Sequence, residues 1–284
     1  MNRHDIHIHP CVEIPRNVIA VIDDLEQCLN RPKEIKVNIH RIRLDIKRLR
    51  GWIRLVRNQP DKQEWQVIDH GLRDIARQLS ASRDEQIIPV TLEWLIKKTK
   101  DRDKQASISK VDSHVQSDNS QQVFDWKSIN LPDKNLLEML KRKTLLSYSD
   151  DIISRGLRKT YKRTLTCGLQ ACRPNGTFAD LHRLRRWIKY LYYQLEFIEA
   201  LYADDYRKIH RQLDKLGKAL GKIHDLILVK NRFQRLSEMT ECVNDVNIAR
   251  TAADTEINKL LKRSISAFDK IFTLKPREFT AGLK

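Results

Sequence analysis

The sequence has few of the residues that interrupt helices, and few cysteines. Only eight glycines and eight prolines occur in 284 residues. The five cysteines are scattered and form no C-x-x-C pair, which argues against a disulfide framework and against a cysteine-based zinc site. What remains is rich in Leu, Lys, Arg, Glu and Gln, which favour helices. The composition therefore predicts an all-α protein.

The chain also lacks a long apolar run. Its N-terminus has no apolar segment of the length that a signal peptide needs. The most apolar stretch, YLYYQLEFIEALYA, is interrupted by Gln194, Glu196 and Glu199. No segment is predicted to span a membrane. Together with the unpatterned cysteines, this predicts a soluble, cytoplasmic protein that does not partner a membrane.

Motifs for catalysis are missing as well. The chain has no GxxxxGK[ST] loop, no HExxH and no GxSxG. Asp84, Asp225 and the acid pairs 150–151 and 204–205 could hold a metal, but helix caps and surface acids are the simpler interpretation. The histidines of HDIHIH at 4–9 could bind a metal adventitiously. We predict no catalytic residues, no metal and no cofactor, and keep a metal-dependent phosphohydrolase as an alternative.

Positive charge is what the sequence has in excess. Lys and Arg number 54 against 37 Asp and Glu, a formal net charge of +17. Such an excess repels itself in a compact state, so a polyanionic partner is expected. The composition does not separate nucleic acid, an inorganic phosphate polymer and an acidic membrane surface.

Helical periodicity organises most of the chain. It predicts helices at about 13–30, 33–58, 64–79, 84–98, 149–171, 178–203 and 205–221, followed by a helical tail to about 272. Residues 99–124 are polar and are predicted to form a mobile connector. The ends of the chain, 1–12 and 273–284, are predicted to be flexible.

An internal repeat links the two halves. The stretch IHRIRLDIKRL at 39 aligns with LHRLRRWIKYL at 181, and LRDIARQLSASRDEQII at 72 aligns with LDKLGKALGKIHDLILV at 213. Arg16 and Arg158 also precede the two aligned histidines by the same interval. The chain is therefore predicted to contain two copies of one helical unit, about 13–98 and about 125–272, offset by about 142 residues.

The stretch VNIHRIRLDIKRLRGWIRLVR at 37–57 carries the clearest functional pattern. At about 100° per residue, its cations fall within an arc of about 120° beside an apolar arc, over about 36 Å of helix. They are Lys33, Lys36, His40, Arg43, Lys47, Arg50, Arg54 and Arg57. The arc contains no acid, so a ligand with repeated negative charge would relieve its repulsion. A solvated face on a basic protein is the alternative.

These motifs resemble the CHAD family (conserved histidine α-helical domain). HRIRLDIKRLR, LHRLRRWIKYLYYQLE and LGKALGKIHDLILV carry the resemblance, which extends from about residue 13 to 272 with the connector as an insertion. The H-x-x-R-x-x-x-K spacing is moderately specific alone, and quite specific when it occurs twice with the downstream block. The resemblance implies two pseudo-symmetric four-helix bundles around a basic central pore. It also implies binding of inorganic polyphosphate and association with polyphosphate granules.

Carried over to matching positions, the resemblance implies the ligands His40, Arg43, Lys47, Arg50, His182, Arg185 and Lys189, with Arg83 and His224 near the mouth. The basic rows and the repeat alignment add Arg16, Lys36, Arg54, Arg77, Arg155, Arg158, Lys162, Lys218 and Lys222. The predicted function is non-catalytic binding of polyphosphate or another polyanion. Nucleic-acid binding is the alternative, and is disfavoured because few aromatics interleave with the cations.

Overall fold

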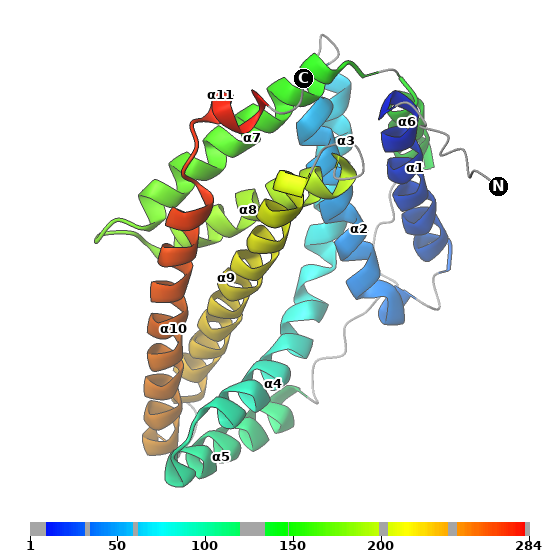
Figure 1. Ribbon diagram of the computed structural model, residues 1–284. Coiled ribbons are helices and arrows are strands. Elements are labelled where there is room, and N and C mark those ends of the chain that lie inside the picture. Colours follow the sequence, from blue (N-terminus) through cyan, green and yellow to red (C-terminus); the bar gives the residue numbers. More distant parts are fainter. Residues whose placement is uncertain are drawn as a thin grey trace, which may run out of the picture. The chain divides into compact units, whose positions relative to one another are not determined.

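The structure, a computed structural model, describes residues 10–31, 35–58, 62–119, 134–146, 148–198, 204–237 and 243–281. These ranges contain helices and no strand, which confirms the predicted all-α class. The helices in Figure 1 are α1 (Pro10–Leu29), α2 (Ile35–Val56), α3 (Lys62–Gln78), α4 (Ser80–Lys98), α5 (Arg102–Asn119), α6 (Lys134–Thr144), α7 (Asp150–Ala171), α8 (Phe178–Ile198), α9 (Asp204–Ser237), α10 (Val243–Ile271) and α11 (Pro276–Phe279). Within the described ranges, every helix is too short or too polar to cross a membrane.

The chain divides into two compact units. The first unit comprises residues 1–78, 126–214 and 271–284, and the second comprises 79–125 and 215–270. The long helix α9 contributes its start to the first unit and the remainder to the second. The predicted division into an N-terminal and a C-terminal repeat stays a prediction.

The core of the first unit is built around α2, which packs against α1, α3, α7 and α8. Its apolar face is buried as the periodicity predicts, through Ile39, Ile42, Ile46, Leu49 and Ile53. Trp52 is also fully buried and meets two aromatic rings edge-on, those of Tyr148 and Phe197. Burial of this face fixes which side of α2 its cations can occupy.

Helices α2 and α8 cross closely at Gly51. A side chain at that position would place its Cβ 3.0 Å from the Cβ of Tyr193, and Gln194 Nε2 donates to the Gly51 carbonyl at 3.1 Å. On one side of the crossing Arg48 pairs with Glu196 at 2.8 Å, and on the other the Arg54 guanidinium lies over the Tyr190 ring.

These crossing contacts follow the numbering of the repeat. Gly51 and Tyr193 are 142 residues apart, the offset of the two sequence copies. In the second copy, the position equivalent to Arg48 is Tyr190, and the position equivalent to Arg54 is Glu196. The Arg48–Glu196 contact and the Arg54–Tyr190 contact therefore join equivalent pairs of positions. A two-fold relation between equivalent helices would give this pattern. The pattern supports the repeat, which itself stays a prediction.

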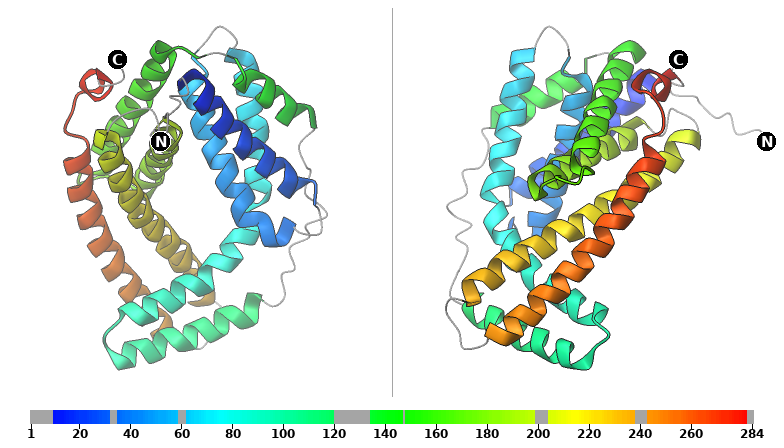
Figure 2. Two further views of the ribbon diagram at one scale, coloured as in Figure 1. Left: turned by 45° about the vertical axis from the view of Figure 1, so that its right-hand side comes forward. Right: turned by 90° about the vertical axis from the view of Figure 1, so that its left-hand side faces the viewer.

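The second unit contains α4, α5, most of α9 and α10 (Figure 2). The prediction of a mobile connector at 99–124 is wrong for residues 102–119, because they form α5. Ile108, Val111 and Val115 are spaced for one helix face and are buried, and α5 packs on α4. Three apolar residues suffice here, although the segment as a whole is polar. Residues 120–124 lie outside the described ranges.

The C-terminal prediction is also wrong over residues 274–281. Helix α11 packs on α7, and buried Phe279 stacks on Tyr161 with ring centroids 4.1 Å apart. Tyr161 Oη donates to the Leu274 carbonyl at 3.0 Å, and Tyr206 Oη to the Phe279 carbonyl at 2.6 Å. One aromatic side chain therefore anchors a segment whose composition looks flexible. At the other end α1 begins at Pro10, so the prediction of a flexible terminus is wrong for residues 10–12. Residues 1–9 with their histidines lie outside the described part.

Candidate anion-binding site

The first row of predicted ligands lies on α2. His40, Arg43 and Lys47 share one helix face, where His40 is exposed and the other two are half-buried. Arg43 Nη1 donates to the Ala76 carbonyl on α3 at 2.7 Å. This bond directs Arg43 along α3 toward the end where exposed Arg77 lies. We call His40, Arg43 and Lys47 the α2 row.

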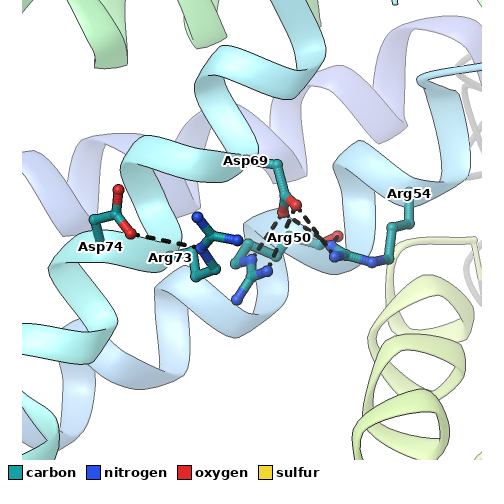
Figure 3. A network of polar contacts seen from close by, with 5 residues as sticks. All are labelled: Arg50, Arg54, Asp69, Arg73 and Asp74. Carbon is teal, nitrogen blue, oxygen red and sulfur yellow. Dashed lines mark hydrogen bonds and ion pairs between the residues drawn. The ribbon is translucent and has the colours of Figure 1, made fainter.

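Arg50 and Arg54 continue on the same helix but have a carboxylate partner. Arg50 Nε donates to Asp69 of α3 at 2.8 Å, and Arg54 donates to both Asp69 oxygens at 2.9 and 3.1 Å (Figure 3). Arg54 also lies over the Tyr190 ring of α8, 3.9 Å from its centroid. These two predicted ligands therefore join α2 to α3 and α8, and part of their charge is balanced inside the protein.

The pKa shifts follow from this network. Burial alone would raise the pKa of Asp69, but the hydrogen bond from Arg50 and the charge of Arg54 outweigh it and lower the pKa to about 2. Burial lowers the pKa of Arg57, and the charge of neighbouring Arg54 lowers it further. The Asp69 carboxylate thus stabilises the charge of several guanidinium groups at the end of α2.

We expect Asp69 to make folding stability depend on pH in the acid range. Its folded pKa of about 2 lies below the ordinary value of 3.8, so its contribution is present above pH 3.8 and lost as the pH falls toward 2. The loss should amount to about 2 kcal/mol. Urea unfolding at constant ionic strength would measure it. Asp69→Asn should lack this decline, while Asp74→Asn on the same helix should keep it; equal declines in both variants would contradict the assignment.

A second row of predicted ligands lies on α8. His182 is followed by half-buried Arg185 and Lys189 on the same face. Partial burial lowers the pKa of His182, and the charges of Arg185 and Arg186 lower it further. This lowered pKa favours the neutral form of the imidazole. We call His182, Arg185 and Lys189 the α8 row.

The crossing of α2 and α8 fixes how the two rows lie. Arg48 precedes the crossing point on α2 and contacts Glu196, which follows it on α8, so the two helices run in opposed directions there. His40 and His182 each precede the crossing point by eleven residues, about 16 Å of helix. The α2 row and the α8 row therefore lie on opposite sides of the crossing and do not contact each other there.

Further predicted ligands of the first unit lie on α7 and α1. Arg155, Arg158 and Lys162 of α7 line one cavity together with residues of the C-terminal segment. Arg16 of α1 is exposed.

The second unit holds Lys218, Lys222 and His224 on α9. Lys218 is exposed, and Lys222 Nζ lies 4.8 Å from the centroid of the Trp94 ring on α4. The aromatic face gives this ammonium a favourable contact within its own unit. The side chains of Lys36 on α2 and Arg83 on α4 lie outside the described part of the chain.

Some residues at these sites cannot be predicted from the residue pattern of a single helix. The α2 sequence does not point to Asp69, because no acid lies on the α2 face itself and Asp69 of α3 meets the arginines only when the helices pack. Arg73 of α3 lies beside Arg50 and forms an ion pair with Asp74 at 3.5 Å (Figure 3). The spacing of Asp69, Arg73 and Arg77 by four residues was the available sequence signal.

The fold and these rows define an all-helical, basic protein whose cations gather on a few packed helices. The CHAD domain model matches residues 20–234, and the chain belongs to the CHAD family. The crystal structure of the CHAD domain from the plant Ricinus communis is similar, with a TM-score of 0.62 at 17% sequence identity over 94% of this chain and 96% of that one. At this identity the likeness concerns the fold. No curated protein matches the chain.

Proposed function

We propose that this protein binds inorganic polyphosphate as a non-catalytic module. The observation that carries the proposal is the pair of matching rows, the α2 row and the α8 row, each with a histidine, an arginine and a lysine at the same spacing. Neither row contains an acid on its face. Phosphate oxygens accept charge-assisted hydrogen bonds from all three side-chain types. The family's association with polyphosphate supports the same ligand.

A long ligand suits the distance between the rows. Because they lie on opposite sides of the α2–α8 crossing, a small anion could occupy one row at a time, whereas a flexible polymer could reach both. Polyphosphate repeats one charge per phosphate and has no bases, so it needs cations in series and no base-specific contacts. A basic pore is part of this proposal, as is association with polyphosphate granules.

The aromatic residues near the rows give nucleic acid little to stack on. Trp52 is fully buried, and Tyr190 is buried beneath the Arg54 guanidinium. Tyr192 beside the α8 row already stacks on His210, with ring centroids 4.3 Å apart. Single-stranded nucleic acids are usually held by exposed aromatic faces as well as cations. These contacts favour polyphosphate over the nucleic-acid alternative.

The metal-dependent phosphohydrolase is the third function considered. Among the described residues, no three His, Cys, Asp or Glu side chains come together as a metal site would need. The Asp84 side chain lies outside those residues. Release of orthophosphate that requires Mg²⁺ or Mn²⁺ and disappears in Asp225→Asn would establish this alternative.

Titration at matched ionic strength tests the proposal. We expect long-chain polyphosphate to bind at least about tenfold more tightly than single- or double-stranded oligonucleotides of equal charge, with an affinity that falls steeply as salt rises. Isothermal titration calorimetry across a salt series would measure both effects. Oligonucleotide binding that equals or exceeds polyphosphate binding would overturn the proposal.

A further inference from the structure

A cavity of about 830 Å³ lies between α7 and the C-terminal segment. Six cations line it: Arg155, Arg158, Lys159, Lys162, Lys275 and Arg277. The only carboxylate among its described lining residues is Glu278, which accepts a hydrogen bond from the Lys275 backbone N–H at 2.8 Å. We call this space the α7–α11 cavity.

The C-terminal wall of the α7–α11 cavity is held in place by buried aromatic residues. Phe279 is buried and stacks on Tyr161 of α7, and the Tyr161 hydroxyl bonds the Leu274 carbonyl. Tyr206 of α9 bonds the carbonyl at the other end of α11. Lys275 and Arg277 lie between these anchors, so they are fixed opposite the cations of α7. The cavity is therefore a built feature of the first unit.

Most of its positive charge is not balanced within the protein. Arg155 pairs with Asp151 at 2.8 Å, and Lys159 bonds the neutral side chain of Asn58 at 2.9 Å. Arg158, Lys162 and Arg277 have no carboxylate partner among the described residues. Cations that line one cavity repel one another, and a multivalent anion would reduce that repulsion.

The lining also restricts the class of anion. None of the nine described lining residues is aromatic, so nothing there would stack on a nucleobase. The volume lies within the range of small-ligand sites. Arginine forks and lysine ammonium groups are the usual partners of phosphate oxygens.

We propose that the α7–α11 cavity binds a short run of linked phosphate groups, as in pyrophosphate or tripolyphosphate. This deepens the proposed function and rests on it, because the same chemistry is presented by the end of a polyphosphate chain. A chain end carries more charge than an internal phosphate, which suits a cavity that six cations line. The cavity would then recognise ends or free oligophosphates, while the α2 row and the α8 row bind the middle of a chain.

Calorimetric titration with tripolyphosphate tests the cavity. We expect the affinity to fall at least about tenfold in Lys275→Ala/Arg277→Ala, since each lost charge-assisted contact is worth about tenfold. Lys262→Ala/Arg263→Ala removes the same charge from exposed positions of α10 and should change the affinity less than about twofold. Lys275 and Arg277 are exposed, so their truncation should leave the fold intact. Arg158→Ala/Lys162→Ala removes two cations from the α7 wall of the cavity and should lower the affinity for tripolyphosphate by the same factor.

The source of the phosphates is distinguished by blocking chain ends. If chain ends occupy the cavity, capping both ends of long-chain polyphosphate should weaken its binding to the wild type. The weakened affinity should equal that of uncapped polymer for Lys275→Ala/Arg277→Ala. Equal binding of capped and uncapped polymer, with tripolyphosphate affinity still lost in the variant, assigns the cavity to free oligophosphates. If both cavity variants keep the wild-type affinity for tripolyphosphate, the inference about the cavity is wrong, whether or not long-chain polyphosphate binds. If the wild-type protein does not bind long-chain polyphosphate, the proposed function is refuted instead.

Discussion

Arg43→Glu combined with Lys47→Glu is expected to lower the affinity for long-chain polyphosphate by about 100-fold or more. Two cations of the α2 row become two anions, and charge-assisted hydrogen bonds are worth about 1.5–3 kcal/mol each. The new carboxylates also repel the polymer. The slope of log affinity against log salt should decrease by about two as well. Calorimetry or fluorescence anisotropy with end-labelled polymer would measure both quantities.

The control for this variant is Lys262→Glu with Arg263→Glu. It makes the same change in net charge at exposed positions of α10 outside both rows. The affinity of this control should stay within about twofold of the wild type, because exposed single charges outside a binding row contribute little. Arg43 donates to the Ala76 carbonyl, so circular dichroism and thermal melting must establish that the double variant is folded. Wild-type affinity in the folded double variant would refute the α2 row as a binding surface.

The α2 row could be predicted because a helix face is a local property. The interval between His40, Arg43 and Lys47 fixes their common side once the segment is helical, and the buried isoleucines between them fix which side is outward. The same reasoning applies to His182, Arg185 and Lys189. Burial is the main cause of the lowered His182 pKa, and only the smaller contribution of Arg185 and Arg186 could be predicted from neighbours in sequence.

The ion pairs of Arg50 and Arg54 with Asp69 could not be predicted in the same way. Their partner Asp69 is on the next helix, and only the antiparallel packing of α3 on α2 brings the carboxylate within 3 Å. The sequence of α2 alone does not show which of its arginines will meet a carboxylate on another helix. The α7–α11 cavity has the same origin, because Lys275 and Arg277 join the α7 cations only after Phe279 docks on Tyr161.

Two of the segments predicted to be flexible are helical for the same physical reason. Residues 102–119 are mostly polar and residues 274–281 are half polar, so the average composition of each segment predicts no stable packing. Their structure depends on a few apolar residues in the right positions: Val111 and Val115 with Ile108 in α5, and Phe279 in α11. Short helices that pack on a neighbour need only a narrow apolar stripe.

The packing of α7 on α2 gives the largest expected effect on stability. Gly156 of α7 is buried, and an added Cβ would lie 1.8 Å from the carbonyl oxygen of Leu55 and 2.7 Å from its carbonyl carbon. Backbone atoms of a packed helix cannot rotate away as a side chain can, so the two helices must separate. We expect Gly156→Ala to lower the free energy of unfolding by about 3 kcal/mol, beyond the gain of about 1 kcal/mol from better helix propensity. Urea unfolding at pH 7 would measure the loss.

Gly71→Ala is the matched control because it makes the same chemical change inside α3. Its Cβ would meet Leu136 Cδ2 at 2.6 Å, a flexible side-chain end that can adopt another rotamer. Its stability should stay within about 1 kcal/mol of the wild type. Equal losses in both variants would show that the Gly156–Leu55 approach is not a backbone constraint. Since Leu55 lies two turns beyond Lys47, folded Gly156→Ala protein should still bind polyphosphate through the α2 row, which separates the helix contact that holds the fold from the cations that bind the ligand.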